Sequence, residues 1–251
     1  PGTGPWNQQL GRYWSHDHAE RIVIDPNVNH VWLITKSATF REFSAIATAG
    51  PRLRPYGSNS PSDEYRQLSY DDPAAGGTGG WQLQDLDGTV TYFLSSGLWD
   101  KTVGKNPANV VQGAYSGNTL TSVSFPDGRS ETYTYNATTG KLASITEVGV
   151  AAGDSRTWTY GWGGDDLTTI GLPDGRSYQM FYSTDPSFPG YLTRIDLTGP
   201  GGAHRVQTAW TYDANGNVSQ IWRGDPNPGD PGAADLYSFS YDNAQLSTQV
   251  A

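Results

Sequence analysis

Cysteine is absent from the 251 residues, which excludes disulfide bonds and thiolate–metal chemistry. Basic residues are few, since 16 Lys and Arg stand against 25 Asp and Glu, for a formal net charge of −9. Nucleic acids and anionic membrane surfaces attract basic proteins, so this balance argues against either as a partner. Only 35% of the residues are hydrophobic, and no apolar run approaches the roughly 20 residues that a membrane-spanning helix needs.

Glycine, proline and aromatic residues are plentiful instead, with 31 Gly, 16 Pro, 15 Tyr and 9 Trp. This composition predicts many short strands joined by tight turns, with aromatic side chains supplying the buried area. No segment of ten or more residues is predicted to be helical, and the length suits one large all-β domain or two smaller ones. The chain begins with Pro1 and carries no signal-peptide pattern, so we expect a piece of a longer protein.

One sequence pattern occurs twice, first from Phe125 to Ile145 and again from Leu172 to Ile195. Each copy opens with Pro-Asp-Gly-Arg-Ser, continues into a strand rich in Tyr and Thr, and ends after a second turn with a Leu-x-x-Ile segment. Proline presets the first corner of a type I turn, and glycine takes the left-handed position after it. Self-similarity at this period indicates a β-repeat.

The second half of this pattern also occurs after other tyrosines. Each such tyrosine is followed by a polar turn and then by Leu or Val, usually with a second apolar residue three positions later. Side chains of a strand alternate between its faces, so Leu-x-x-Ile requires either two covered faces or a bulge that shifts the register. The sequence leaves both open. The predicted repeat anchors are Tyr115, Tyr135, Tyr160, Tyr182, Tyr212 and Tyr241.

The fullest copy runs from Trp210 to Ile221 and contains Tyr-Asp-Ala-Asn-Gly-Asn-Val. Together with Tyr241-Asp242-Asn243 it resembles the tyrosine–aspartate (YD) repeat of the bacterial RHS family, which also occurs in teneurins and in shell components of toxin complexes. Only Tyr212 and Tyr241 of the anchors keep the Asp. The resemblance implies an all-β fold of consecutive antiparallel β-hairpins that form a long, twisted, curling sheet, a fragment of a β-shell.

Residues 1–109 are predicted to be the N-terminal hairpin segment leading into the repeats, and residues 110–251 to hold about five to six hairpin units. The stretch Leu10 to His16 resembles the segment that opens many RHS proteins. Residues 50–63 are rich in Pro, Gly and Ser and are predicted to form a long surface loop. Trp81 to Phe93 is predicted to be a hairpin with an Asp-Gly turn.

Two motifs could bind metals, but each has a structural explanation that we favour. His16-Asp17-His18 offers two ligands, yet the other histidines, His30 and His204, belong to distant segments. Asp213-x-Asn215-x-Asn217 has the spacing that opens a calcium loop, but the closing Glu of an EF-hand is missing and Asn-Gly is a common hairpin turn. We therefore expect no metal or cofactor.

Two acidic segments could be catalytic, but neither forms a complete catalytic motif. The acidic pair Asp165-Asp166 follows two glycines at a predicted turn tip, where Asp is favoured for backbone reasons and no buried cleft would raise a carboxyl pKa. The run Asp225 to Asp230 matches the self-cleaving aspartate motif of the RHS family in composition alone and lies between repeats. We expect a protein that is not an enzyme, with no catalytic residues.

Tryptophans could form a carbohydrate-binding surface, since aromatic faces stack on sugar rings. Trp158, Trp162 and Trp222 are the candidate contacts to glycan or a partner, and Trp210 shares the pattern. We favour packing between neighbouring hairpins instead, because these residues alternate with Thr and Tyr inside predicted strands.

The resemblance implies a function and a location. It indicates a non-enzymatic structural segment of a secreted or surface-exposed bacterial RHS-repeat protein, part of a β-shell that encloses or displays a C-terminal effector. Its partners would be downstream parts of its own polypeptide, namely the effector and the remaining repeats. The alternative is an extracellular adhesion module whose exposed aromatic residues bind carbohydrate or a cell-surface protein.

Overall fold

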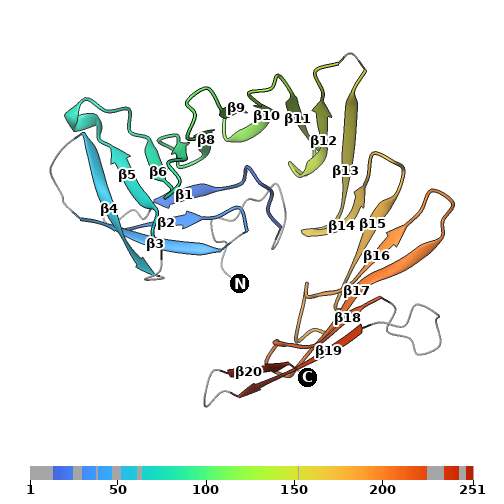
Figure 1. Cartoon of the computed structure of the whole chain (residues 1–251). Helices are drawn as coiled ribbons and strands as arrows, with labels where there is room; N and C mark the ends of the chain where they lie inside the picture. The colour runs from blue at the N-terminus through green and yellow to red at the C-terminus, as the bar shows by residue number, and fades with distance from the viewer. Residues whose placement is uncertain are drawn as a thin grey trace. The chain divides into compact units, whose positions relative to one another are not determined.

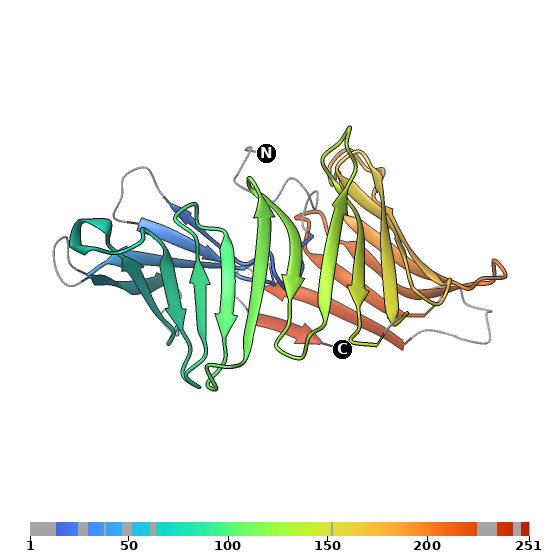
Figure 2. The ribbon, with the colours of Figure 1, turned by 90° about the horizontal axis from the view of Figure 1, so that it is seen from above.

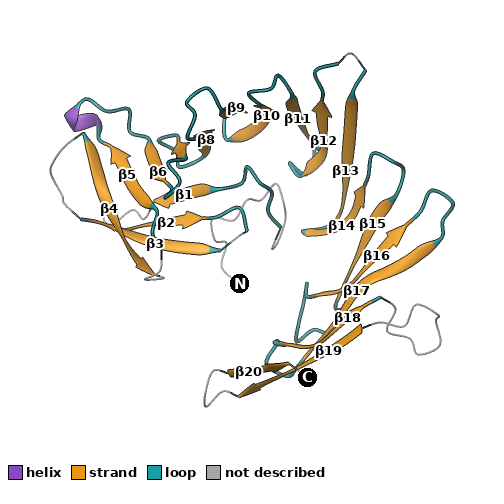
Figure 3. Cartoon of the chain, in the orientation of Figure 1, coloured by secondary structure: helices purple, strands orange, loops and turns teal. Residues whose placement is uncertain are grey.

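The computed structural model describes residues 14–24, 30–37, 39–46, 52–60, 64–151, 153–224, 235–242 and 247–250. The chain divides into two compact units, residues 1–156 and residues 157–251. Within the described part, all regular structure is β-strand except one 3₁₀ turn at Pro73–Ala75 (Figures 1 and 3). The predicted all-β class is confirmed.

Unit 1 is built from strands that each pair antiparallel with the next along the chain, from β1 to β12. Such sequential pairing is the topology of consecutive hairpins. The strands are β1 (Arg21–Ile24), β2 (His30–Ile34), β3 (Phe40–Ala45), β4 (Leu53–Ser60), β5 (Gln67–Asp71), β6 (Trp81–Gln84), β7 (Val90–Phe93), β8 (Trp99–Val103), β9 (Val110–Ser116), β10 (Thr119–Ser124), β11 (Ser130–Tyr135) and β12 (Leu142–Val148).

Unit 2 repeats the same topology, and Figure 2 shows its strands, yellow to red, as neighbouring antiparallel arrows. The first strand, β13, starts two residues before the unit boundary. The strands are β13 (Ser155–Gly163), β14 (Asp166–Gly171), β15 (Ser177–Tyr182), β16 (Leu192–Thr198), β17 (His204–Tyr212), β18 (Val218–Arg223), β19 (Asp235–Asp242) and β20 (Ser247–Val250).

The sheet of unit 1 rolls up on itself between β1 and β8. The amide of Ile22 in β1 donates to the carbonyl of Gly97, in the turn between β7 and β8, at 2.8 Å. Gly97 has φ +82°, and a Cβ there would lie 2.0 Å from the Ile22 carbonyl oxygen, so only glycine permits this approach. The roll encloses the deepest apolar side chains, among them Val31, Leu33, Phe43 and Leu68.

The loop prediction for residues 50–63 is wrong, because β4 (Leu53–Ser60) occupies most of that stretch. Its first four residues pair with β5 in register from Leu53 opposite Asp71 to Tyr56 opposite Leu68. Tyr56 is buried and packs edge-on against Trp81, at 5.0 Å between ring centroids. Tertiary packing of this one aromatic outweighs the local Pro/Gly/Ser composition.

Both Pro-Asp-Gly turns form as predicted. Gly128 and Gly175 take φ +88° and +82°, and the amide of Gly128 donates to the carbonyl of Phe125 at 3.1 Å. The Asp side chain accepts from the backbone amide of the Arg two positions on, at 3.1 Å in both turns. These turns fix the register of the strands that follow them.

A bulge resolves the Leu-x-x-Ile question. In β11–β12 the register runs Tyr133 opposite Ile145, then Tyr135 opposite Leu142, with one extra residue on the Leu strand. Because Tyr133 and Tyr135 share a face, Leu142 and Ile145 share it too. The register shifts at the same place in β9–β10, β13–β14, β15–β16 and β17–β18. This common side, the anchor face, carries the repeat tyrosines.

Candidate functional site

The strongest recurring feature is a hydrogen bond between successive hairpins. The anchor tyrosine stands at the end of its strand, and its hydroxyl group donates a hydrogen bond to a backbone carbonyl of the preceding hairpin. That carbonyl belongs to the Leu, Val or Trp that follows the bulged turn. The bonds are Tyr115 to Trp99 (2.5 Å), Tyr135 to Leu120 (2.8 Å), Tyr182 to Leu167 (2.6 Å), Tyr212 to Leu192 (2.6 Å) and Tyr241 to Val218 (2.9 Å). We call this set the tyrosine ladder.

Burial keeps three tyrosines of the ladder in their donor form. Burial raises the pKa of Tyr135 to about 12 and also raises the pKa of Tyr115 and Tyr212. These three hydroxyl protons therefore stay in place over the physiological pH range. Each bond links residues 15 to 23 positions apart, so each tyrosine of the ladder ties its own hairpin to the hairpin before it.

Tyr160 does not occupy the anchor position of its hairpin. In β13–β14, Trp162 lies opposite Leu167 across the bulge, and Tyr160 lies opposite Ile170, where Tyr133 stands in β11. The spacing explains this: Trp162 precedes Leu167 by five residues, as Tyr115 precedes Leu120. This spacing is the sequence signal that marks Trp162, whereas the recurrence of tyrosine alone points to Tyr160.

The ladder register also begins upstream of Val110. In β7–β8, Phe93 lies opposite Trp99 with the same shift of register, and Trp99 supplies the carbonyl for Tyr115. Trp99 is 3% exposed. Gly113 on β9 makes room for its ring, since a Cβ there would come within 2.8 Å of it.

His16 and His18 pack onto the anchor face of unit 1. The His18 ring stacks on Trp99 at 4.8 Å between centroids and lies 3.7 Å from a Glu131 carboxylate oxygen. The His16 ring lies 5.6 Å from that of Tyr133, and its Nδ1 accepts from the backbone amide of His18 at 3.1 Å. Among the described residues no three His, Asp or Glu side chains gather in a way that could hold a metal ion.

Replacing His16 should flatten the acid dependence of stability. Burial, together with nearby His18, lowers the pKa of His16 to about 4 from 6.5. Between these values the unfolded chain binds a proton that the folded chain does not, so stability is complete above about pH 6.5 and falls as the pH drops toward 4. From about pH 7 to about pH 4.5 this one group costs about 2 to 3 kcal/mol.

The measurement is urea unfolding of the wild type and of His16→Asn at both pH values. Asn does not titrate and retains an acceptor near the Nδ1 position, while the contributions of the carboxylates are common to both proteins. We expect the wild type to lose about 2 kcal/mol more than the variant. Equal losses would show that His16 is not buried in its neutral form.

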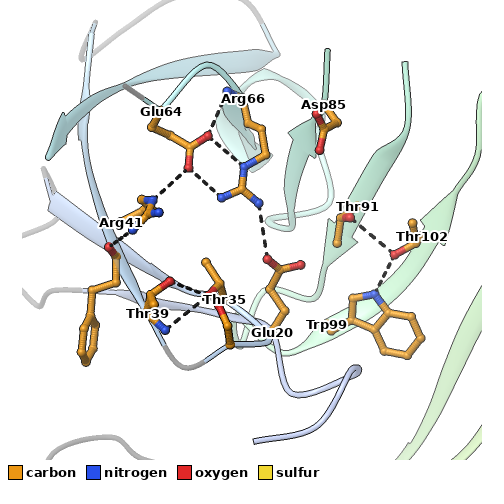
Figure 4. A network of polar contacts seen from close by, with 12 residues as sticks. Glu20, Thr35, Thr39, Arg41, Glu64, Arg66, Asp85, Thr91, Trp99 and Thr102 are labelled. Atoms are coloured by element: carbon orange, nitrogen blue, oxygen red, sulfur yellow. Dashed lines mark hydrogen bonds and ion pairs between the residues drawn. The ribbon is translucent and has the colours of Figure 1, made fainter. Parts of the chain in front are cut away.

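Four charged side chains inside unit 1 form a connected network of ion pairs (Figure 4). Arg66 donates through Nε and Nη2 to both Glu64 oxygens, at 2.8 and 2.6 Å, and its Nη1 lies 3.6 Å from Glu20. Arg41 lies 3.4 Å from Glu64 on the other side. The Arg66 bonds lower the pKa of Glu64, whereas burial raises that of Glu20.

Two carboxyl groups with opposite pKa shifts are one mark of an acid–base pair. Here both carboxylates are bound to Arg66, and neither Glu20 nor Glu64 lines either of the two grooves described below. The network ties the segment before β1 to β3 and to the segment before β5.

Turn geometry accounts for the calcium-like motif. The two Asp213 carboxylate oxygens accept from the amides of Asn215 and Asn217, at 2.9 and 2.8 Å, and from the Asn217 side chain at 3.1 Å. These bonds lower the pKa of Asp213, and Gly216 takes φ +82°. The carboxylate is thereby engaged by its own turn. The Asp225–Asp230 run lies outside the described residues.

The candidate tryptophans do not form one surface. Trp158 and Trp162 lie on the anchor face of β13, whereas Trp222 lies next to Ile221 on the opposite face of β18. All three are half-buried. Trp222 instead lines a shallow groove of about 370 Å³ on unit 2, together with Phe181 and Arg194.

A larger groove of about 640 Å³ lies on unit 1, beside Tyr92 and Lys101. The Lys101 ammonium sits 5.1 Å from the centre of the Tyr92 ring. Elsewhere in the lining of this groove, the Asp71 carboxylate accepts hydrogen bonds from Arg52 Nε at 2.6 Å and from the Thr78 hydroxyl at 2.8 Å. Arg52, Asp71 and Thr78 are thus bonded to one another in this part of the lining.

No family model matches the sequence, and no curated protein matches it. Solved structures do. The crystal structure of TcdB2-TccC3-Cdc42 is 13% identical with a TM-score of 0.47, covering 90% of this chain and 12% of that one. The Photorhabdus luminescens Tc holotoxin pore is 10% identical with a TM-score of 0.32, covering 90% and 16%. A porin-like protein from Bacteroides uniformis is 10% identical with a TM-score of 0.32, covering 95% and 96%.

This chain is similar to these structures at low identity. It spans less than a fifth of the length of the two toxin-complex chains, and TM-scores below 0.5 carry no argument about function. The repeat therefore rests on the motif, the bulged register and the tyrosine ladder. In the described part of the chain no helix is long and apolar enough to cross a membrane.

Proposed function

We propose that the chain is a non-enzymatic structural segment of a bacterial RHS-repeat protein, part of a β-shell around a C-terminal effector. The tyrosine ladder carries this proposal, because one contact recurs between successive hairpins. Repeat proteins of this kind gain stability from each unit and from its contact with the next. Each added hairpin lengthens one continuous sheet, and a shell needs such a sheet as its wall.

The partners that fit this role are the downstream effector and the remaining repeats of the same polypeptide. Exposed edge strands of a sheet pair readily with further strands, and this suits a segment that continues into more hairpins. The surplus of acidic over basic residues favours these partners over nucleic acid. We place the protein outside the cell, secreted or at the bacterial surface.

Limited proteolysis of the full-length gene product that contains this sequence tests the shell. The variant carries Tyr→Phe at Tyr115, Tyr135, Tyr182 and Tyr212, and each lost hydroxyl bond costs about 1 kcal/mol. We expect the polypeptide C-terminal to residue 251 to resist protease in the wild type and to be digested sooner in the variant. Mass spectrometry of the fragments measures this.

Tyr65→Phe is the matched control, since Tyr65 is 70% exposed. This variant should leave the protection of the downstream polypeptide unchanged. A thermal melt of each protein measures whether the quadruple variant is less stable than the wild type. Digestion of the downstream polypeptide at the same rate in a loosened variant and in the wild type would overturn the shell.

A further inference from the structure

One straight row of side chains crosses four strands of unit 2 on the face opposite the tyrosines. Phe181 on β15 lies directly opposite Arg194 on β16, and Arg194 lies opposite Ala209 on β17. Ala209 in turn lies opposite Trp222 on β18. The two aromatic residues are thus three inter-strand steps apart, roughly 14 Å, with Arg194 and the small Ala209 between them.

The row forms a groove rather than a filled surface. Its volume of about 370 Å³ is bounded by Phe181, Trp222, Arg194, Ala209 and the hydroxyl-bearing Thr193 and Thr211, among others. Phe181 is 37% exposed, and the Arg194 guanidinium stacks over its ring at 4.2 Å. Ala209 supplies the hollow, because its methyl group cannot fill the space between the Arg194 and Trp222 side chains on either side of it.

The charges in the groove cancel. Arg194 Nε lies 3.0 Å from a carboxylate oxygen of Asp196, whose side chain is 4% exposed. Neutralised in this way, the guanidinium remains a planar hydrogen-bonding surface without net attraction for an anion. An uncharged ligand with hydroxyl groups complements this groove better than an acidic or basic one.

We propose that this groove binds a neutral oligosaccharide. The polarised C–H groups on the face of a sugar ring pack on the Trp222 ring and on the face of the Phe181 ring that Arg194 leaves open, and the distance between these rings suits a chain of several sugars. Thr193 donates to the Phe181 carbonyl at 3.1 Å and Thr211 pairs with Ser219 at 2.9 Å. Each threonine oxygen keeps capacity to accept from a sugar hydroxyl.

An extended peptide fits this groove less well. Peptides that add to a sheet form backbone hydrogen bonds with a free strand edge. The groove lies on the face of β15–β18, whose successive strands are paired with one another, so it offers a peptide no backbone ladder. The sugar-binding role goes beyond the structural role proposed above and does not depend on it.

Isothermal titration of this chain with cellohexaose, xylohexaose and mannohexaose tests the groove. We expect saturable binding of at least one, and about a tenfold or greater loss of affinity in both Trp222→Ala and Phe181→Ala, as when a single ring-stacking contact is removed. Ala209→Leu keeps both rings and fills the hollow, so it should abolish binding. Circular dichroism checks that each variant is folded.

Phe40→Ala is the matched control, since Phe40 on β3 of unit 1 is 46% exposed and lies outside the groove. An acidic oligogalacturonate and an extended Thr/Val peptide are the competing ligands, and we expect neither to match the neutral sugars. The proposal is overturned if none of the three hexasaccharides binds at millimolar concentration. It is equally overturned if binding survives in folded Trp222→Ala, Phe181→Ala and Ala209→Leu, or if the peptide binds more tightly than any of the sugars.

Discussion

Trp99→Ala should lower the free energy of unfolding by about 3 to 5 kcal/mol, the range for truncating a buried tryptophan. The side chain is 3% exposed and its Nε1 donates to Thr102 Oγ1 at 3.0 Å (Figure 4). Its ring also stacks on His18. Truncation leaves a cavity beneath the N-terminal segment and removes the surface on which His18 packs.

Urea unfolding of wild type and variant gives the difference, with Trp158→Ala as the control. Trp158 is half-buried near the start of β13, so its truncation should cost well under half as much. A second readout separates packing from general instability: trypsin should cut near Arg21 sooner in Trp99→Ala under native conditions. Equal losses for the two tryptophans would mean that Trp99 is not a centre of the core.

Local sequence chemistry is sufficient to predict the hairpins. Pro-Asp-Gly and Asn-Gly set turn positions through residues whose backbone preferences are strong, and Gly128, Gly175 and Gly216 take the expected left-handed conformation. The bulge is another matter. Whether Leu142 and Ile145 share a face depends on the partner strand, which a single strand's pattern does not encode.

The same limit explains the error at Tyr160. The recurrence of tyrosine equates Tyr160 with Tyr135, but the anchor position is defined by its distance from the bulged turn, and Trp162 occupies that position. Strand β4 was missed because its composition is that of a loop, and only its pairing with β5 makes it a strand.

The groove on unit 2 could not be found from sequence for a related reason. Phe181, Arg194, Ala209 and Trp222 are separated by 13 or more positions, and their alignment depends on three pairings, each with a register shift. Only the donors of the tyrosine ladder can be predicted from the sequence, because the tyrosines recur in it. The acceptors are backbone carbonyls, which every residue carries, so no residue type identifies them.

Leu142→Ala and Leu192→Ala should differ in cost although both occupy the same repeat position. Each leucine lies opposite an anchor tyrosine across the bulge, Leu142 opposite Tyr135 and Leu192 opposite Tyr182. Leu142 is 1% exposed, whereas Leu192 is half-buried. Truncation of a fully buried leucine costs about 2.7 to 5 kcal/mol because a cavity remains, and a half-buried site loses less and refills with solvent.

We expect Leu142→Ala to cost about 3 to 4 kcal/mol and Leu192→Ala about 1 to 2 kcal/mol in chemical unfolding. Hydrogen exchange adds the location, since protection should fall chiefly in β11 and β12 for the first variant and in β15 and β16 for the second. This pattern follows if each hairpin is stabilised by its neighbours alone. Loss of protection throughout the chain in both variants would contradict nearest-neighbour stabilisation, and equal energetic costs would contradict the difference in burial on which the prediction rests.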